Sequence, residues 1–175
     1  DGTGNSEIFS QENSILYSPR WSPNGKNLAF IVENLSTQDL EKNNFLNFDL
    51  YIFHLDENIV QKAFSYKFPL VVKEQEYEPQ FFDYNFFFWS PDSKKIAYIN
   101  YLDNKPDSSF ARELFLEINY YDLDSGEFVN VSETTLAWDE DGFLYHPLAW
   151  SPDSSMIAFS DYAKNNHGLF LYDLK

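Results

Sequence analysis

One pattern of apolar and polar positions recurs three times along the chain. It consists of a tryptophan, a short polar turn, and an apolar run with a small alanine at its centre. The three copies read WSPNGKNLAFI at 21–31, WSPDSKKIAYI at 89–99 and WSPDSSMIAFS at 150–160. A match of this length, seen three times, indicates an internal repeat, which is typical of solenoids and propellers.

The centre of each copy predicts a tight turn between two strands. Proline sets φ at the second turn position, Asn or Asp suits the third, and Gly25 tolerates a positive φ at the fourth. Ser93 and Ser154 replace that glycine in the second and third copies. If this position is left-handed, each serine costs on the order of 1 kcal/mol of backbone strain.

The pattern around the turn predicts a four-stranded antiparallel sheet in each unit. An aromatic strand ends at the tryptophan, and the Leu/Ile-Ala-Phe/Tyr run forms a second strand bounded by polar residues. Apolar runs that end in acidic residues, at 49–56, 114–124 and 168–174, supply a third strand. We expect a fourth strand near 60–65 in the first unit and at 127–131 in the second.

The units are longer than a plain four-stranded blade of about 40–45 residues. The extra residues are polar or acidic, at 33–47, 71–80, 100–112 and 132–145, and we interpret them as loops. The predicted organisation is a closing strand and linker at 1–16, a first blade at 17–80, a second blade at 81–135, and a third blade at 136–175 that lacks its fourth strand.

These residues resemble the TolB-like propeller repeat, which also occurs in the propeller domains of prolyl-oligopeptidase-type peptidases. The family motif reads roughly P-x-W-S-P-D-G-K-x-I-A-F, followed by a Leu-Tyr-x-x-Asp strand. Residues 19–30 match it most fully, whereas Phe87 replaces the leading proline in the second copy and Pro147 stands one position early in the third. The resemblance implies an all-β fold: a β-propeller fragment or half-ring of three four-stranded antiparallel blades, one blade being shared between the N- and C-termini.

The ends of the chain give two expectations for how such a ring closes. Residues 6–10 resemble the fourth strand of a preceding blade, and the chain stops after a third strand. Three blades are too few for closure, because propellers typically have four to eight. The favoured reading is a piece of a longer propeller; the other is a homodimer in which two chains form a six-bladed ring.

Composition and charge argue against several classes of function. Aromatic residues make up 19 % of 175 residues, which argues against disorder. The net charge of −16 disfavours nucleic-acid binding and attraction to anionic membranes. Since there is no cysteine, disulfides and zinc–thiolate sites are excluded. No apolar run reaches the ~18 residues of a membrane-spanning helix, so we expect no membrane insertion.

The sequence offers few candidate catalytic residues. A serine hydrolase needs Gly-x-Ser-x-Gly, which does not occur here. His54 lies in a strand run and fits a structural role, His167 fits a solvated loop, and His146 is the histidine nearest a channel-facing position. The acidic stretch 139–141 lacks the further ligands of a calcium loop and reads as a turn. We expect no catalytic residue, no metal and no cofactor.

The aromatic stretch 81–89 is the most unusual local feature. Its alternation places Phe82, Tyr84, Phe86 and Phe88 on one face and Phe81, Phe87 and Trp89 on the other. A strand buried on both faces explains it; an aromatic patch lining the channel or its rim is the functional alternative. Arg20 is a charge inside an inner-strand motif. The candidate binding residues are Arg20, Tyr84, Phe86, Tyr145 and His146.

The resemblance implies a non-enzymatic binding module or scaffold for a protein or peptide partner. It also implies a periplasmic or extracellular location. Two alternatives stay open. In the first, the chain is the gating propeller of a prolyl-oligopeptidase-type serine peptidase whose catalytic domain lies outside these residues. In the second, it is a structural subunit of a larger assembly.

Overall fold

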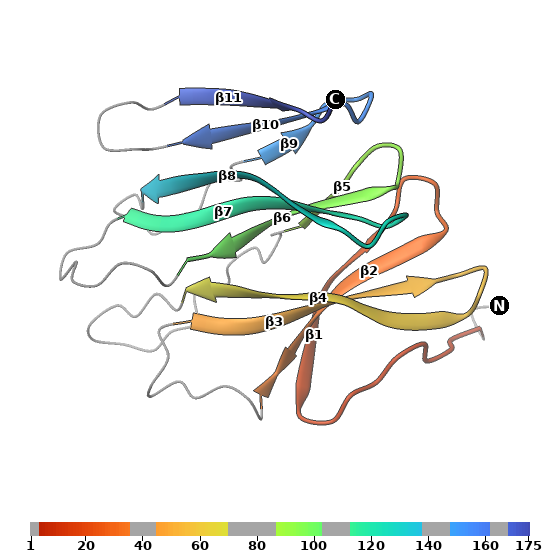
Figure 1. The fold of residues 1–175 in the computed structure, drawn as a ribbon. Coiled ribbons are helices and arrows are strands. Elements are labelled where there is room, and N and C mark those ends of the chain that lie inside the picture. Colours follow the sequence, from red (N-terminus) through yellow and green to blue (C-terminus); the bar gives the residue numbers. More distant parts are fainter. Residues whose placement is uncertain (1–3, 36–44, 70–86, 103–112, 138–147, 162–167) are drawn as a thin grey trace. The chain divides into compact units, whose positions relative to one another are not determined.

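The computed structural model describes residues 4–35, 45–69, 87–102, 113–137, 148–161 and 168–175 (Figure 1). Within these ranges all regular structure is β, and the strands form three antiparallel sheets of four, four and three strands. The all-β prediction is therefore confirmed. The chain divides into two compact units, Asp1–Leu70 and Val71–Lys175.

The first unit holds one sheet, which we call blade 1. Its strands follow one another in the order β1-β2-β3-β4, each antiparallel to the last, as the repeat pattern predicts. The strands are β1 (Ser14–Trp21), β2 (Asn27–Asn34), β3 (Phe45–His54) and β4 (Ile59–Pro69).

The second unit holds two sheets, blade 2 and blade 3. Blade 2 has the same order, β5-β6-β7-β8, and blade 3 has the order β11-β10-β9. The strands of blade 2 are β5 (Phe87–Trp89), β6 (Lys95–Tyr101), β7 (Glu113–Asp122) and β8 (Phe128–Ala137). Those of blade 3 are β9 (Leu148–Trp150), β10 (Met156–Asp161) and β11 (Gly168–Asp173).

The repeat gives every blade two distinct faces. Side chains alternate along a strand, and directly paired residues share a face. We call the face that carries the repeat's alanine the A face and the face that carries its tryptophan the B face. In blade 3, Ala158 pairs with Ala149 on the A face, and Ile157 pairs with Trp150 on the B face.

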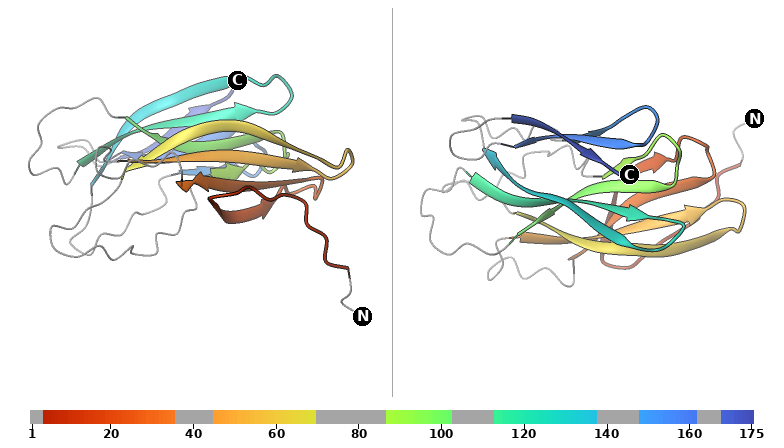
Figure 2. Two further views of the ribbon diagram at one scale, coloured as in Figure 1. Left: turned by 90° about the horizontal axis from the view of Figure 1, so that it is seen from below. Right: turned by 45° about the horizontal axis from the view of Figure 1, so that its top comes forward.

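The core of the second unit lies between the A face of blade 2 and the B face of blade 3. In Figure 2, right, β9–β11 in blue lie over β5–β8 in green and cyan. Half-buried rings, including Phe88, Tyr120 and Trp150, pack against this cluster. Its buried members are Ala97, Ile99, Leu116, Ile118, Leu148, Ile157 and Phe159.

Blade 1 buries apolar side chains on both faces. On its A face Ala29, Ile31 and Leu50 are fully buried. On its B face the ring of Phe9, from the segment before β1, lies 5.3 Å from the ring of Phe30 and 5.0 Å from that of Tyr51. Residues 4–11 form no strand here, so their pairing with another blade stays a prediction.

The fourth position of the repeated turn is left-handed in all three blades. The φ angles are +72° at Gly25, +65° at Ser93 and +61° at Ser154. The sequence interpretation of this turn is confirmed, and the two serines carry the strain that a non-glycine residue has in this conformation.

Candidate binding surface

The polar residues of the repeated turn hold the turn itself together. The serine hydroxyl donates to the Asn or Asp two residues later, at 2.8 Å in Ser22–Asn24, 2.5 Å in Ser90–Asp92 and 2.7 Å in Ser151–Asp153. The same hydroxyl oxygen accepts from a backbone N–H five residues on, which fixes the start of the second strand. These hydrogen bonds stabilise the turn.

The turn environment keeps the aspartates charged. Hydrogen bonds from the Ser151 and Ser155 hydroxyls and the Ser155 backbone N–H lower the pKa of Asp153 to about 2. Burial acts to raise the pKa of Asp92, but the Ser90 hydroxyl, the Lys94 N–H and two lysine charges outweigh it and lower that pKa. These shifts follow from hydrogen bonds that close the turns.

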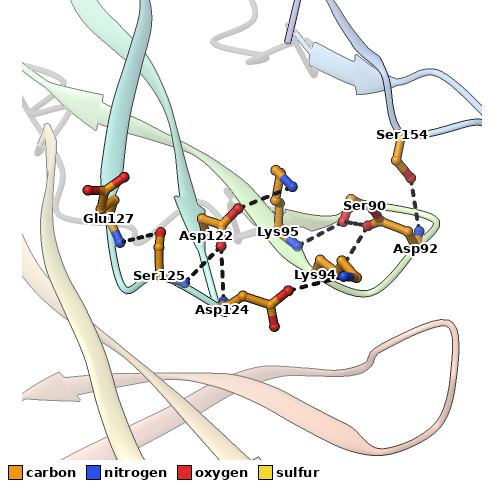
Figure 3. Close-up of polar contacts among 9 residues, drawn as sticks. All are labelled: Ser90, Asp92, Lys94, Lys95, Asp122, Asp124, Ser125, Glu127 and Ser154. Atoms are coloured by element: carbon orange, nitrogen blue, oxygen red, sulfur yellow. Dashed lines mark hydrogen bonds and ion pairs between the residues drawn. The ribbon is translucent and has the colours of Figure 1, made fainter. Parts of the chain in front are cut away.

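Lysines bridge neighbouring turns at the same end of the blades (Figure 3). Lys94 Nζ lies 3.1 Å from Asp124 Oδ2, and this contact raises the pKa of Lys94. In blade 1, Lys26 Nζ lies 3.0 Å from Asp56 Oδ2 in the corresponding arrangement. Because these pairs are exposed, each contributes little to stability.

Hydrogen bonds join blade 2 to blade 3. The backbone N–H of Asp92 donates to Ser154 Oγ at 2.9 Å, which Figure 3 shows at the upper right. The indole Nε1–H of Trp150 donates to the backbone carbonyl of Phe88, also at 2.9 Å. The repeat therefore supplies an interblade contact as well as a turn.

Strand β1 departs from regular pairing at its centre. Tyr17 pairs with Ile31 and Arg20 with Ala29, so the register shifts between them. Ser18 has a φ of +50°, a strained value for a serine that precedes a proline. Such bulges re-aim side chains and are common at sheet edges, and β1 is the first strand in the order of its sheet.

The A face of β1 carries a mixed set of side chains, which we call the β1 strip: Ile15, Tyr17 and Arg20, together with Glu33 of β2. Tyr17 Oη donates to Glu33 Oε2 at 2.5 Å, and Glu33 is buried. Ile15 pairs with Glu33 and is 42 % exposed, whereas Arg20 is half-buried. The strip combines an apolar contact, a buried carboxylate and a guanidinium.

Of the predicted binding residues, only Arg20 lies among the described residues. Tyr84, Phe86, Tyr145 and His146 lie outside them, as does the acidic stretch 139–141. In the aromatic stretch the described part is β5, in which Phe87 is fully buried and Phe88 packs into the interblade core. Trp89 is half-buried, and residues 81–86 lie outside the described residues, so burial of the whole stretch on both faces stays a prediction.

His54 makes a structural contact in blade 1. Its Nδ1 lies 2.9 Å from Asn27 Oδ1, and the two residues pair across β2 and β3. Buried tyrosines elsewhere keep their protons, since burial, with the nearby charge of Glu117, raises the pKa of Tyr98 to about 12. Neither the His54 contact nor the pKa of Tyr98 indicates a role in proton transfer.

Sequence reasoning missed the Tyr17–Glu33 hydrogen bond and the bulge at Ser18. Two signals were present: Glu33 ends an apolar run, and Ser18-Pro19 interrupts a strand pattern. Within the described residues, no three His, Asp or Glu side chains gather as metal ligands would. No helix in that part of the chain is long and apolar enough to span a membrane.

Solved structures with a β-propeller fold are similar to this chain. TolB from Acinetobacter baumannii matches with a TM-score of 0.51 and 16 % identity, over 95 % of this chain and 31 % of that one. An oligogalacturonate lyase from Vibrio parahaemolyticus matches with 0.59 and 13 %, over 100 % and 40 %. The β-propeller domain of the Trilobed protease from Pyrococcus furiosus matches with 0.55 and 16 %, over 93 % and 40 %.

The chain thus has a TolB-like propeller fold and spans well under half the length of these structures. No protein-family model matches the sequence. No curated protein sequence matches it either. At these identities the likeness establishes the fold, and one propeller fold serves many activities.

Proposed function

We propose that this chain is a non-enzymatic, TolB-like propeller binding module or scaffold, and that it contacts a protein or peptide through the β1 strip. The observation that carries the proposal is the bulged edge strand itself. It holds strain at Ser18, places Arg20 on the same face as the Tyr17–Glu33 pair, and leaves Ile15 exposed. Strained backbone conformations cluster at functional sites, so the strain at Ser18 supports a binding role for β1.

The strip suits an extended peptide segment. An edge strand offers backbone groups to which a further strand can pair, with side chains alternating to either face. The exposed Ile15 side chain offers an apolar contact. The guanidinium of Arg20 has the planar fork that binds carboxylates. We therefore expect the partner segment to carry an apolar side chain and a carboxylate, at an acidic residue or at its C-terminus.

The charge of the whole chain adds a long-range preference. A net charge of −16 attracts partners with an overall positive charge and speeds their encounter at low salt. The partner is then a basic protein whose contacting segment ends in or contains a carboxylate. By the same proposal, the module acts in the periplasm or outside the cell.

A random 12-residue peptide library with free C-termini, displayed for selection against the purified chain, tests the proposal. We expect enriched peptides to bind the wild-type chain and to lose at least about tenfold in affinity on Arg20→Gln, as for a charge-assisted contact. Lys26→Gln is the matched control, because it removes one charge from the turn end of the same blade. No enrichment, or equal binding by both variants, would refute the β1 strip.

A gating propeller of a prolyl-oligopeptidase-type peptidase is the alternative. The propeller domain of the Trilobed protease shares the fold but leaves this alternative open, since fold alone does not assign activity. A Gly-x-Ser-x-Gly motif encoded in the same reading frame would favour it. A structural subunit that makes no β1 contact is the third reading, and failure of the peptide selection would favour it.

A further inference from the structure

The repeated turn of blade 1 contains an Asn-Gly step. Asn24-Gly25 fills the third and fourth turn positions, where blades 2 and 3 have Asp92-Ser93 and Asp153-Ser154. It is the only Asn-Gly step in the sequence. Both residues are exposed, and Gly25 has a left-handed φ of +72°. Since asparagine is a thermally labile residue, blade 1 has at this turn a chemistry that the other two blades lack.

The space around Gly25 is open to that chemistry. In deamidation the backbone nitrogen of the following residue attacks the side-chain amide carbon, so the reacting atoms here are Gly25 N and Asn24 Cγ. A Cβ on the following residue hinders this attack, and glycine has none. Apart from the two chain neighbours, no heavy atom of the described residues lies within 4 Å of the position that a Cβ of Gly25 would take. No neighbouring group therefore blocks the approach.

Hydrogen bonds of the turn set the starting geometry. Asn24 Oδ1 accepts from the Ser22 hydroxyl at 2.8 Å and from the Lys26 backbone N–H at 3.0 Å. Both donors stabilise the negative charge that develops on this oxygen during the attack. The Gly25 N–H donates to the Ser22 carbonyl at 2.8 Å, and this bond has to open before the nitrogen can react. Exposed turns open locally at a fraction of the free energy of global unfolding.

We propose that Asn24-Gly25 is a self-modification site, at which Asn24 deamidates in the folded chain and gives blade 1 the aspartate turn of the other two blades. Gly25 N forms a bond to Asn24 Cγ, the bond from Cγ to Nδ2 breaks, and ammonia leaves with the Gly25 amide proton. Water then opens the resulting succinimide ring. Addition of water at Cγ gives aspartate, and addition at the main-chain carbonyl carbon gives isoaspartate.

The two products differ in how they fit the turn. In blades 2 and 3 the carboxylates of Asp92 and Asp153 accept from a serine hydroxyl and from a backbone N–H two residues on, as Asn24 Oδ1 does in blade 1. Such bonds are stronger to a carboxylate than to an amide. An aspartate at position 24 therefore closes the turn again.

Isoaspartate does not fit in this way. It adds a methylene group to the main chain, which moves the Gly25 N–H away from the Ser22 carbonyl that it reaches at 2.8 Å. We therefore expect a larger share of aspartate from the folded chain than from the same chain in urea, where no turn constrains the opening of the ring.

Peptide mapping by mass spectrometry, after incubation of the folded 175-residue chain at mildly alkaline pH, tests the proposal. We expect the peptide that holds Asn24 to exchange NH2 for OH with time, and chromatography separates its aspartate and isoaspartate forms. Gly25→Ser is the matched variant, because serine stands at the same left-handed position in blades 2 and 3. It should slow the conversion at least about tenfold, since its Cβ hinders the attack. Asn27, which Leu28 follows, is the internal control and should stay unchanged.

The circular dichroism spectrum of Gly25→Ser shows that it is folded, so a slower conversion reports the hindered attack alone. If Asn24 of the folded chain stays intact, the proposal is overturned, and conversion in urea alone would show that the closed turn protects the step. Equal rates for wild type and Gly25→Ser would overturn it as well, as would equal shares of aspartate from the folded chain and from urea. None of these results bears on the β1 strip, which the peptide selection tests separately.

Discussion

In the third blade, the serine at the fourth turn position carries backbone strain and also forms a contact with the neighbouring blade. Ser154 keeps a left-handed φ of +61°, which costs on the order of 1 kcal/mol. Its hydroxyl accepts the Asp92 backbone N–H across the junction with blade 2. Because a hydrogen bond of this kind contributes about 1 kcal/mol, the contact offsets the strain.

Substitutions at Ser154 separate the two effects. Ser154→Ala keeps the strain and loses the acceptor, so it should lower the free energy of unfolding by about 1 kcal/mol. Ser154→Gly loses the acceptor but relieves the strain, so it should lie close to wild type. Gly25→Ala, which adds a Cβ in open space at φ +72°, is the control for strain alone. Urea unfolding that ranks Ser154→Gly below Ser154→Ala would contradict this account.

The turn aspartate of blade 3 makes stability depend on pH. Its folded pKa of about 2 lies below the ordinary value of 3.8, so its contribution is present above about pH 4 and is lost as pH falls toward 2. Asp153→Asn should therefore be modestly less stable than wild type at pH 7, and the difference should narrow toward pH 3. Asn24 occupies the same position in blade 1 without a titrating group, so the effect of Asn24→Ala should not follow this pH profile. A stability difference between wild type and Asp153→Asn that widens as the pH falls would contradict this prediction.

At the scale of the strands, the tryptophan of the repeat has two roles that depend on its neighbour. In blade 3 it packs into the junction, where the ring of Trp150 lies 6.3 Å from the ring of Tyr120, and it donates to Phe88. In blade 1 the equivalent Trp21 is 53 % exposed. The same residue is thus a core residue or a surface residue according to whether an A face lies against it.

Substituting each tryptophan by phenylalanine compares the two environments. Trp150→Phe removes the indole donor and some buried ring area, and should lower the free energy of unfolding by about 1–2 kcal/mol. Trp21→Phe, measured at protein concentrations where single chains dominate, should change it by less than about 0.5 kcal/mol. Equal losses in urea unfolding would show that the repeat position, not the neighbouring blade, sets the role.

Much of the fold at this scale was predictable from local chemistry. The Ser-Pro-Asn/Asp turn, the run around Ala97 and the fourth strand from Ile59 follow from turn preferences and apolar alternation, which act within a few residues. The bulge at Ser18 and the Tyr17–Glu33 hydrogen bond were not predictable in this way. They depend on pairing between β1 and β2, and the Ser18-Pro19 interruption does not by itself specify a register shift.

At the scale of the whole molecule, blades 2 and 3 join through an A face and a B face. Leu169, on the A face of blade 3, and Trp21, on the B face of blade 1, are exposed.

The exchange of tryptophan indole protons, followed by NMR, tests this junction most directly. It is measured on the wild-type chain at low protein concentration. The Trp150 indole proton should exchange about 100-fold more slowly than that of Trp21, as for an opening free energy of roughly 3 kcal/mol. Equally fast exchange at Trp150 and Trp21 would contradict the account, because blade 3 would then not pack its B face on blade 2.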